Sequence, residues 1–438
     1  MIVSLAIYTV PLALILAFHF HGRFREEVRS TTALSEAVAA GLTEPASLHP
    51  VINKDRCMGC GSCVTACPEG QILGLIGGKA ELLEASQCIG HGACKVACPF
   101  DAITLVFGTA ERGVDIPNVA SDFQTNVPGI YIAGELGGMG LIRNAIEQGR
   151  QALESIAKGH KTSSYDCYDV LIVGAGPAGF AASLAAKEKG LKYLTVEQDS
   201  LGGTVSHFPR GKLVMTAPAT LPIIGRVNFR ETTKEKLLTF WEDVMLKTGV
   251  AIKFQERVEA VTRLAESRDT PSRFEVRTTG GTYKTKTILL AIGRRGTPRK
   301  LDVPGEECTK VVYRLVDPAQ YQGQHVLVVG GGDSAIEAAV SISEELNTTV
   351  TLSYRSDAFN RTKAKNRKKI QKASESGRVK VLFKSSVKNI GKDSVDMKTT
   401  DGAVTIKNDA VIVCAGGILP IGFLKNIGIE IETKYGMA

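Results

Sequence analysis

The sequence lacks a strong excess of charge of either sign. Its 438 residues carry 53 Lys and Arg against 45 Asp and Glu, a formal net charge of +8. Aromatic residues make up 6% of the chain, and they do not alternate with basic residues as they do in the basic grooves that bind nucleic acids. No nucleic-acid partner is therefore expected. No metal-hydrolase, Ser/His/Asp or glutamine-amidotransferase constellation stands out either. We therefore predict no side chain that acts as a catalytic acid, base or nucleophile.

Cysteine is scarce outside one short segment. Seven of the ten cysteines lie between Cys57 and Cys98, and the others are single residues at 167, 308 and 414. Clustering at such short spacings indicates metal ligation rather than a disulfide framework, which fits a reducing compartment. The length predicts about three domains, and 44% hydrophobic residues can fill their cores.

Residues 2–18 contain no charged side chain, and Arg23, Arg25 and Arg29 follow. We predict a single-pass transmembrane anchor at 1–22 of a cell inner membrane, with the soluble domains cytoplasmic by the positive-inside rule, and a linker over 23–50. One alternative is a cleaved signal peptide, although no basic residue precedes the run and no A-x-A-like site follows it. The other is a helix that binds a partner or is buried.

The strongest motif is a pair of cysteine repeats, separated by a hairpin predicted over 72–83 around Gly77-Gly78. At the C-x2-C-x2-C-x3-C-P spacing, three thiolates hold one iron–sulfur cubane and the fourth reaches another. A zinc site is the alternative. The repeats are Cys57-x2-Cys60-x2-Cys63-x3-Cys67-Pro68 and Cys88-x2-His91-x2-Cys94-x3-Cys98-Pro99.

Residues 51–107 resemble the bacterial two-cluster ferredoxins, which are α+β domains. The resemblance implies that Cys57, Cys60, Cys63 and Cys98 hold the first cluster, and that Cys67, Cys88 and Cys94 belong to the second. His91 departs from the family pattern, which has cysteine there. Three outcomes stay open: a His-ligated [4Fe-4S] cluster of raised potential, a [3Fe-4S] cluster with His91 unbound, or no second cluster.

A dinucleotide-binding motif begins at Tyr168. An apolar strand ends in Gly174-x-Gly176-Pro177-Ala178-Gly179 and runs into an Ala-rich helix, whose N-terminus is predicted to face a pyrophosphate. Glu197 ends the next strand, where a carboxylate accepts hydrogen bonds from ribose hydroxyls. The loop Gly202-Gly203-Thr204 follows and suits close approach of a flavin.

Residues 127–157 resemble the closing segment of flavoproteins of the thioredoxin reductase type. The resemblance rests on Ile130-Tyr131-Ile132-Ala133-Gly134-Glu135, the helix after it, and the connector at 288–306. It implies FAD, with Gly134 and Glu135 at the cofactor, although the family has Asp at position 135. That segment comes last in the family and first here, so we predict a circular permutation; an unrelated linker is the alternative.

The glycine pattern recurs as Gly330-x-Gly332-Asp333-Ser334-Ala335 after a second strand. Arg355 stands where an NADH-binding domain has its ribose-binding acid, and Arg361 is nearby, so NADPH is favoured over NADH. The predicted domains are 108–160 (permuted segment), 165–305 (FAD), 306–417 (NAD(P)) and 418–438 (return to the FAD domain). The predicted fold class is thus an α/β flavoprotein with two dinucleotide-binding domains, joined to the ferredoxin-like domain and the membrane helix.

Thioredoxin reductases carry a Cys-x-x-Cys in the NAD(P) domain, and this chain has only Cys308 and Cys414 there. The resemblance therefore implies hydride exchange between nicotinamide and flavin without the disulfide relay. Since flavin links two-electron and one-electron chemistry, we predict an NAD(P)H-dependent oxidoreductase with FAD and two clusters. Its partner is expected to be an electron carrier protein or a quinone, and the family suggests a homodimer. The alternatives are a disulfide or small-substrate reductase and a non-catalytic electron-relay subunit.

Overall fold

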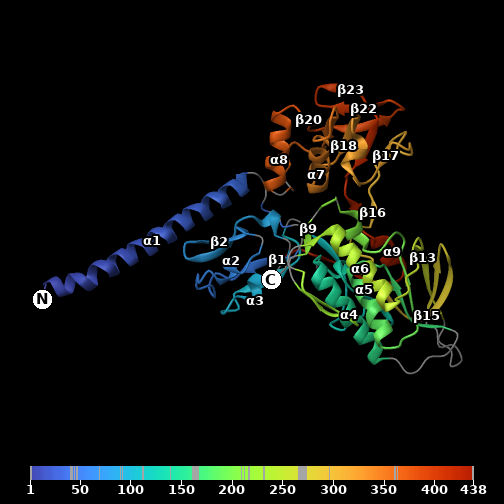
Figure 1. The fold of residues 1–438 in the computed structure, drawn as a ribbon, viewed down its shortest axis with the longest axis horizontal. Coiled ribbons are helices and arrows are strands. Elements are labelled where there is room, and N and C mark those ends of the chain that lie inside the picture. Colours follow the sequence, from blue (N-terminus) through green and yellow to red (C-terminus); the bar gives the residue numbers. More distant parts are fainter. Residues whose placement is uncertain are drawn as a thin grey trace. The chain divides into compact units, whose positions relative to one another are not determined.

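The protein is described from a computed structural model in which the chain divides into two compact units (Figure 1). The first unit comprises Met1–Val114 and Lys434–Ala438, and the second comprises Asp115–Thr433. Two predicted site residues, His91 and Arg361, fall outside the described residues. The structure describes residues 2–39, 43, 45, 48–68, 70–88, 90, 92–110, 113–138, 140–159, 167–208, 210–211, 213–215, 218–229, 232–264, 274–294, 296–359, 362 and 364–436.

The first unit begins with a 38-residue helix, α1 (Ile2–Ala39). Among the residues that the structure describes, no helix is long and apolar enough to cross a membrane. The helix continues through much of the stretch expected to be a linker, where it packs on β2 (Leu73–Ile76) (Figure 1). The backbone N–H of Gly77 donates a hydrogen bond of 2.8 Å to Glu27 Oε1, and Ser30 is buried. This end of α1 is therefore part of the first unit's packed structure.

The rest of the first unit has a short helix in each of the two cysteine motifs and a hairpin between the motifs. The predicted hairpin is confirmed, because β2 pairs with β3 (Lys79–Leu82) in an antiparallel register that leaves Gly77 and Gly78 as the turn. Both turn glycines have positive φ, as a two-residue hairpin turn of this handedness requires. The remaining elements are the antiparallel pair β1 (His49–Ile52) and β4 (Ile103–Val106), the short helices α2 (Ser62–Thr65) and α3 (Ala93–Val96), and the 3₁₀ turn η1 (Ala85–Gln87).

The second unit contains a six-stranded sheet in which β15 pairs with strands from three separate parts of the sequence. β15 (Gly281–Leu290) pairs in parallel with β7 (Tyr168–Val173) and also with β6 (Ile130–Ile132). The sheet order is β13-β14-β15-β7-β8, with β6 joined to β15. Its other strands are β8 (Tyr193–Val196), β13 (Val258–Arg263) and β14 (Phe274–Thr278).

The helices of this domain follow the same arrangement. α4 (Ile142–Lys158) packs along α5 (Pro177–Glu188), the helix that follows the first glycine loop (Figure 1). Gly149 permits this contact, because a Cβ there would lie 2.0 Å from the carbonyl oxygen of Ala178. The segment at 130–158 therefore supplies a strand and a helix to the same domain as the glycine loop. The circular permutation itself stays a prediction about the origin of this order.

A second parallel sheet has the order β17-β24-β18-β19-β20, with α7 and α8 packed on it. Its buried core is made of Val, Ile, Leu and Ala side chains from these strands and helices. The elements are β17 (Val311–Val312), β18 (His325–Val329), α7 (Asp333–Ile342), β19 (Thr349–Ser353), α8 (Ala364–Glu375), β20 (Val379–Leu382) and β24 (Ala410–Val413). A three-stranded antiparallel sheet follows: β21 (Ser386–Ile390), β22 (Ser394–Thr399) and β23 (Gly402–Lys407).

The chain returns to the first sheet after the second. Leu424 and Ile429 are buried in the same core cluster as Ile130 and Leu171. The smaller elements of the second unit are η2 (Glu135–Gly137), η3 (Gly203–His207), β9 (Leu213–Met215), β10 (Ala219–Leu221), β11 (Gly225–Val227), β12 (Thr232–Thr233), α6 (Lys234–Thr248), β16 (Thr297–Pro298), η4 (Pro318–Tyr321), β25 (Gly417–Ile418) and α9 (Ile421–Asn426). β5 (Val114–Pro117) pairs with β26 (Ile431–Lys434).

Candidate functional site

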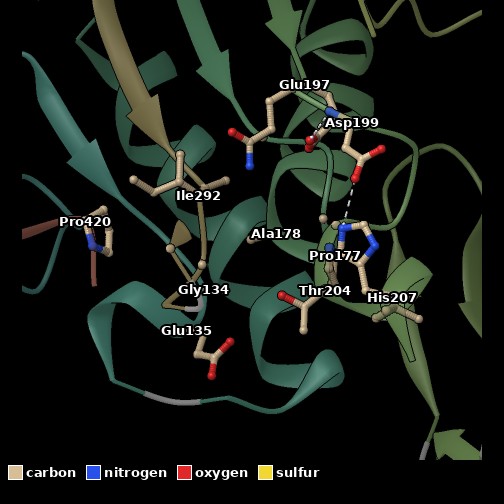
Figure 2. A pocket seen from close by; sticks show the side chains of 18 of the residues that line it. Gly134, Glu135, Pro177, Ala178, Glu197, Asp199, Thr204, His207, Ile292 and Pro420 are labelled. Carbon is tan, nitrogen blue, oxygen red and sulfur yellow. Dashed lines mark hydrogen bonds and ion pairs between the residues drawn. The ribbon is translucent and has the colours of Figure 1, made fainter. Parts of the chain in front are cut away.

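A large cavity opens at the ends of β6, β7 and β8 in the second unit (Figure 2). Its volume is about 1090 Å³, at the upper limit of the roughly 300–1,000 Å³ typical of ligand pockets. The structure brings residues of the permuted segment and of the first glycine loop to its wall together. Of the predicted flavin-site residues, those that line it are Gly134, Glu135, Gly174, Gly176, Pro177, Ala178, Glu197, Gly203 and Thr204.

The glycine loop has the geometry that close approach to a phosphate needs. Gly174 has φ +102°, and a Cβ there would lie 2.6 Å from the carbonyl oxygen of Ala291. Gly179 faces back into the loop, since its Cβ would lie 1.8 Å from the carbonyl oxygen of Gly174. Around Gly176 no atom comes closer than 3.9 Å to a Cβ position, so the cavity side of its backbone is open. The strand, turn and helix are thus as predicted, and the loop can admit a pyrophosphate.

Glu197 is held at the cavity wall by two backbone hydrogen bonds. Its Oε2 accepts from the N–H of Ala175 at 2.7 Å, and its Oε1 accepts from the N–H of Asp199 at 2.9 Å. The residue is buried, and burial raises the pKa of its carboxyl. Each oxygen keeps a lone pair for another donor. This arrangement fits a pair of ribose hydroxyl groups.

Gly134 and Glu135 line the cavity, with Gly134 close to Ala178 of the glycine loop (Figure 2). Gly134 has φ +86° and approaches Ala178, because a Cβ would lie 3.0 Å from that side chain. Its N–H donates to Oε1 of Gln148 on α4 at 2.9 Å, a contact that sequence reasoning missed. The Glu135 carboxylate lies near Gly140 and Gly293: a Cβ on Gly140 would lie 3.3 Å from Oε1, and a Cβ on Gly293 would lie 4.0 Å from Oε2 and from Thr204 Oγ1. The two predicted flavin contacts therefore converge on one part of the wall. Gly202 and Gly179 support the loops from behind and do not line the cavity.

The second glycine loop lines a cavity of about 700 Å³. Gly330 has φ +145°, and its Cβ would lie 2.4 Å from the carbonyl oxygen of Cys414. Ala335 is fully buried behind the loop and does not reach the cavity. The predicted residues on the wall are Gly330, Gly332, Asp333, Ser334 and Arg355.

Three further residues of the second cavity were not predicted. Arg299 and Lys300, from the connector after β15, line the same wall as Arg355 and add positive charge. The ring of Tyr354 lies on the glycine loop, since a Cβ on Gly331 would be 2.2 Å from it. Tyr354 also stacks on Phe359 at 5.7 Å between ring centroids. The wall therefore combines cationic side chains with an aromatic face.

The two cavities share part of their wall, at Thr204, His207, Phe208, Pro298, Tyr313 and Arg314. His207 Nε2 lies 3.1 Å from Asp199 Oδ2 (Figure 2), and Arg314 is hydrogen-bonded to His207. Arg314 also lies 3.4 Å from Asp199. His207, Asp199 and Arg314 belong to none of the predicted motifs, and 107 positions separate His207 from Arg314. Only folding brings them together.

The first unit gathers the cysteines in two sets. One small cavity is lined by Cys57, Cys60, Cys63 and Cys98 but not by Cys67. Burial raises the pKa of the Cys63 thiol to about 11, with smaller contributions from the neighbouring Cys57 and Cys60. Burial also raises the pKa of Cys94, and the charges of Cys88 and Cys67 add to the effect. These are the two sets that the ferredoxin resemblance implies, while their ligation stays a prediction.

The first cysteine set has the surroundings that an anionic cluster needs. The N–H of Ala80 donates to Cys57 Sγ at 3.4 Å, and the N–H of Ala102 donates to Cys98 Sγ at 3.4 Å. Cys60 Sγ and Ser62 Oγ lie 3.4 Å apart. Donors aimed at thiolate sulfurs suit a [4Fe-4S] cluster. Among the described residues, no three His, Cys, Asp or Glu side chains converge closely enough for a single metal ion.

Comparisons with known proteins agree with both units. A family model described as a pyridine nucleotide-disulphide oxidoreductase matches residues 171–437, and one described as a 4Fe-4S dicluster domain matches residues 49–99. A ferredoxin–NADP reductase from Ignicoccus hospitalis is 28% identical over 275 residues, which cover 61% of this chain and 83% of the relative. One from Thermus thermophilus is 31% identical over 280 residues, covering 61% and 79%.

Among solved structures, bacillithiol disulfide reductase Bdr (YpdA) from Bacillus cereus is similar, with a TM-score of 0.51 and 25% identity. The similarity covers 61% of this chain and 83% of that one. The first family model spans more than half of the 438 residues. The chain therefore belongs to the pyridine nucleotide-disulphide oxidoreductase family, and it carries a 4Fe-4S ferredoxin-type domain ahead of that fold.

Proposed function

We propose that this oxidoreductase moves electrons between NADPH and a one-electron carrier protein, by way of FAD and ferredoxin-type clusters. The observation that carries the proposal is the adjoining pair of nucleotide-type cavities in one chain with the paired cysteine motifs. The similarity to two ferredoxin–NADP reductases supports it. A quinone is the alternative electron partner.

Each nucleotide has a distinct set of residues to hold it. In the first cavity, Glu197 accepts from ribose hydroxyls, the loop at 174–179 receives the pyrophosphate, and Gly134 and Glu135 contact the flavin side. In the second cavity, Arg355 and Lys300 offer cations to a 2′-phosphate, and Tyr354 and Arg355, rather than an acid that would select a free ribose hydroxyl, directly follow β19. Bound FAD supplies the exchange between hydride and single electrons. The chain's own part is to bind, orient and shield the two nucleotides.

Anaerobic titration of the purified full-length chain with NADPH tests this proposal. The expected result is loss of the flavin absorbance, followed by a reduced-cluster signal in low-temperature electron paramagnetic resonance. Cys57→Ser should remove the first cluster's signal and leave the flavin bleaching intact. Cys167→Ser, at a buried cysteine outside both motifs, should change neither.

Other outcomes would replace the proposal. Flavin bleaching with oxidised clusters and turnover of disulfides would favour a disulfide or small-substrate reductase. No reaction with any pyridine nucleotide would favour a non-catalytic electron-relay subunit. Faster reaction with NADH than with NADPH would overturn the nucleotide assignment.

We also propose that residues 1–22 anchor the protein to a cell inner membrane, with its soluble domains in the cytoplasm. The support is the uncharged stretch at 2–18 and the three arginines after it. Deletion of residues 1–22 should move the protein from the membrane fraction to the supernatant. Persistence in the membrane fraction would contradict the anchor. A homodimer is proposed from the family resemblance, and sedimentation of detergent-solubilised protein tests it.

A further inference from the structure

The hydrogen bonds at Cys57, Cys98 and Cys60 in the first cysteine set differ in origin. Those to Cys57 and Cys98 come from backbone N–H groups of Ala80 and Ala102, so the fold supplies them whatever side chains stand there. The contact with Cys60 comes from the Ser62 hydroxyl at 3.4 Å. As a thiol, Cys60 donates to Ser62 Oγ; as a thiolate ligand it has no proton, and the hydroxyl becomes the donor. This is the contact that a single substitution can remove.

The internal repeat provides a natural comparison for Ser62. Cys60-Gly61-Ser62-Cys63 in the first motif corresponds to His91-Gly92-Ala93-Cys94 in the second. The backbone is the same at both places: Gly61 has φ 78° and ψ −2°, Gly92 has φ 75° and ψ 2°, and each precedes a four-residue helix. Alanine at position 93 has no hydroxyl group to donate. The two motifs therefore differ in this side-chain donor while sharing its backbone setting.

Cys60 is also the most exposed cysteine of the first set. It is exposed, whereas Cys98 is half-buried and Cys57 and Cys63 are buried. Met58 and Phe100, which line the same small cavity, are 66% and 46% exposed. Electrons pass between proteins most readily at an exposed edge of a cofactor, so a hydrogen-bond donor at the exposed Cys60 would act where a partner can approach.

We propose that Ser62 tunes the first cluster, its hydroxyl donating a hydrogen bond to the Cys60 thiolate and thereby raising the reduction potential. The physical reason is charge. Reduction adds an electron to an already anionic cluster, and a donor at a ligand sulfur stabilises the more negative state more strongly. This inference rests on the first cluster of the proposed function but not on any reaction with NADPH. Ser62 acts through Cys60 and is a positioning residue.

The test is electrochemical titration of the full-length chain, with mediators and dithionite in place of NADPH, followed by electron paramagnetic resonance. Ser62→Ala should shift the electron-exchange equilibrium of the first cluster about three- to tenfold toward the oxidised state, the effect of one hydrogen bond. Ser62→Thr keeps the hydroxyl and should restore the wild-type potential. Ala93→Ser places a hydroxyl in the second motif and should leave the first cluster's potential unchanged.

Each result decides the inference. An unchanged potential in Ser62→Ala overturns it, and so does an equal shift in Ser62→Thr. If Ser62→Ala fails to retain the cluster, the same titration of Ser62→Gly, which also lacks the hydroxyl, decides the matter. A first-cluster potential shifted toward the oxidised state supports the hydrogen bond, and an unchanged potential overturns it. Failure of NADPH to reduce a cluster would refute the proposed function and leave this result standing.

Discussion

The two glycine loops of the second unit have the same strand–turn–helix arrangement and differ in the side chains that they place beside a ligand. In both, the first glycine has positive φ and lies against the carbonyl of the residue that follows the neighbouring strand, Ala291 after β15 for Gly174 and Cys414 after β24 for Gly330. After the next strand, the first loop meets the buried carboxylate of Glu197, while the second meets Tyr354 and Arg355. The comparison shows that close packing of strand and helix determines the conformation of the turn. The residue after the second strand determines which group of the nucleotide the site can bind.

The largest expected effect comes from exchanging the third residue of each loop. Gly179→Ala would place a Cβ 1.8 Å from the carbonyl oxygen of Gly174, whereas the second loop already has Ala335 at that position. We expect a loss of about 3 kcal/mol in the free energy of unfolding, the upper range for overpacking, together with loss of FAD. Chemical denaturation and flavin content measure it. Ala335→Gly is the matched change and should cost about 1 kcal/mol with FAD retained. Equal losses would show that the loops do not differ in packing.

Removal of the acid at the first loop comes next. Glu197→Ala should weaken FAD binding about 100-fold, because a hydrogen bond to a charged group contributes roughly 1.5–3 kcal/mol. Isothermal titration of the apoprotein with FAD measures the affinity. Glu242→Ala, which removes an exposed acid of α6 that does not line the cavity, is the control and should bind FAD as the wild type does. Unchanged affinity in Glu197→Ala would remove the ribose assignment.

The proposed contact of Arg355 with the 2′-phosphate of NADPH is tested at the second loop. Arg355→Ala should raise the KM for NADPH about tenfold, the low end of the contribution of a charged hydrogen bond of roughly 1.5 kcal/mol, and leave the KM for NADH nearly unchanged. Steady-state reduction of an artificial acceptor with each nucleotide gives the two constants. An equal rise for both nucleotides would mean that Arg355 does not meet the 2′-phosphate.

The smallest expected effect is a pH dependence of the apoprotein. Burial raises the pKa of Glu197 above its ordinary value of 4.5. An acid whose pKa is raised in the folded protein contributes to folding stability at pH values below its ordinary pKa. This contribution is lost as the pH rises through the folded pKa, where the buried group ionises. Relative to the wild type, Glu197→Gln should therefore become more stable as pH increases from below 4.5 to about 7. Urea denaturation of both apoproteins at several pH values measures the difference. A constant difference across pH would show that Glu197 titrates normally.

Local patterns could be predicted because their chemistry lies within a few residues. The turn at Gly77-Gly78, both strand–glycine–helix units and the spacing of the cysteines follow from neighbouring residues. The contacts of Gln148 with Gly134, and of Arg314 with His207 and Asp199, have no local signal, because they join elements remote in sequence. Lys300 illustrates the same limit, since it belongs to a connector in the sequence and to a cavity wall in the fold.

The sequence by itself determined the kinds of site this protein contains: thiolates at cluster spacing, glycines where backbone must approach phosphate, and an acid or an arginine to choose the ribose. The tertiary structure decided which of these pieces share a cavity. Pairing of β6 with β15 brings Gly134 beside Ala178, and the cysteines divide into two sets across their repeats. The physical reason is that residue type and spacing encode local geometry, whereas sheet pairing between distant segments depends on the whole core being buried at once.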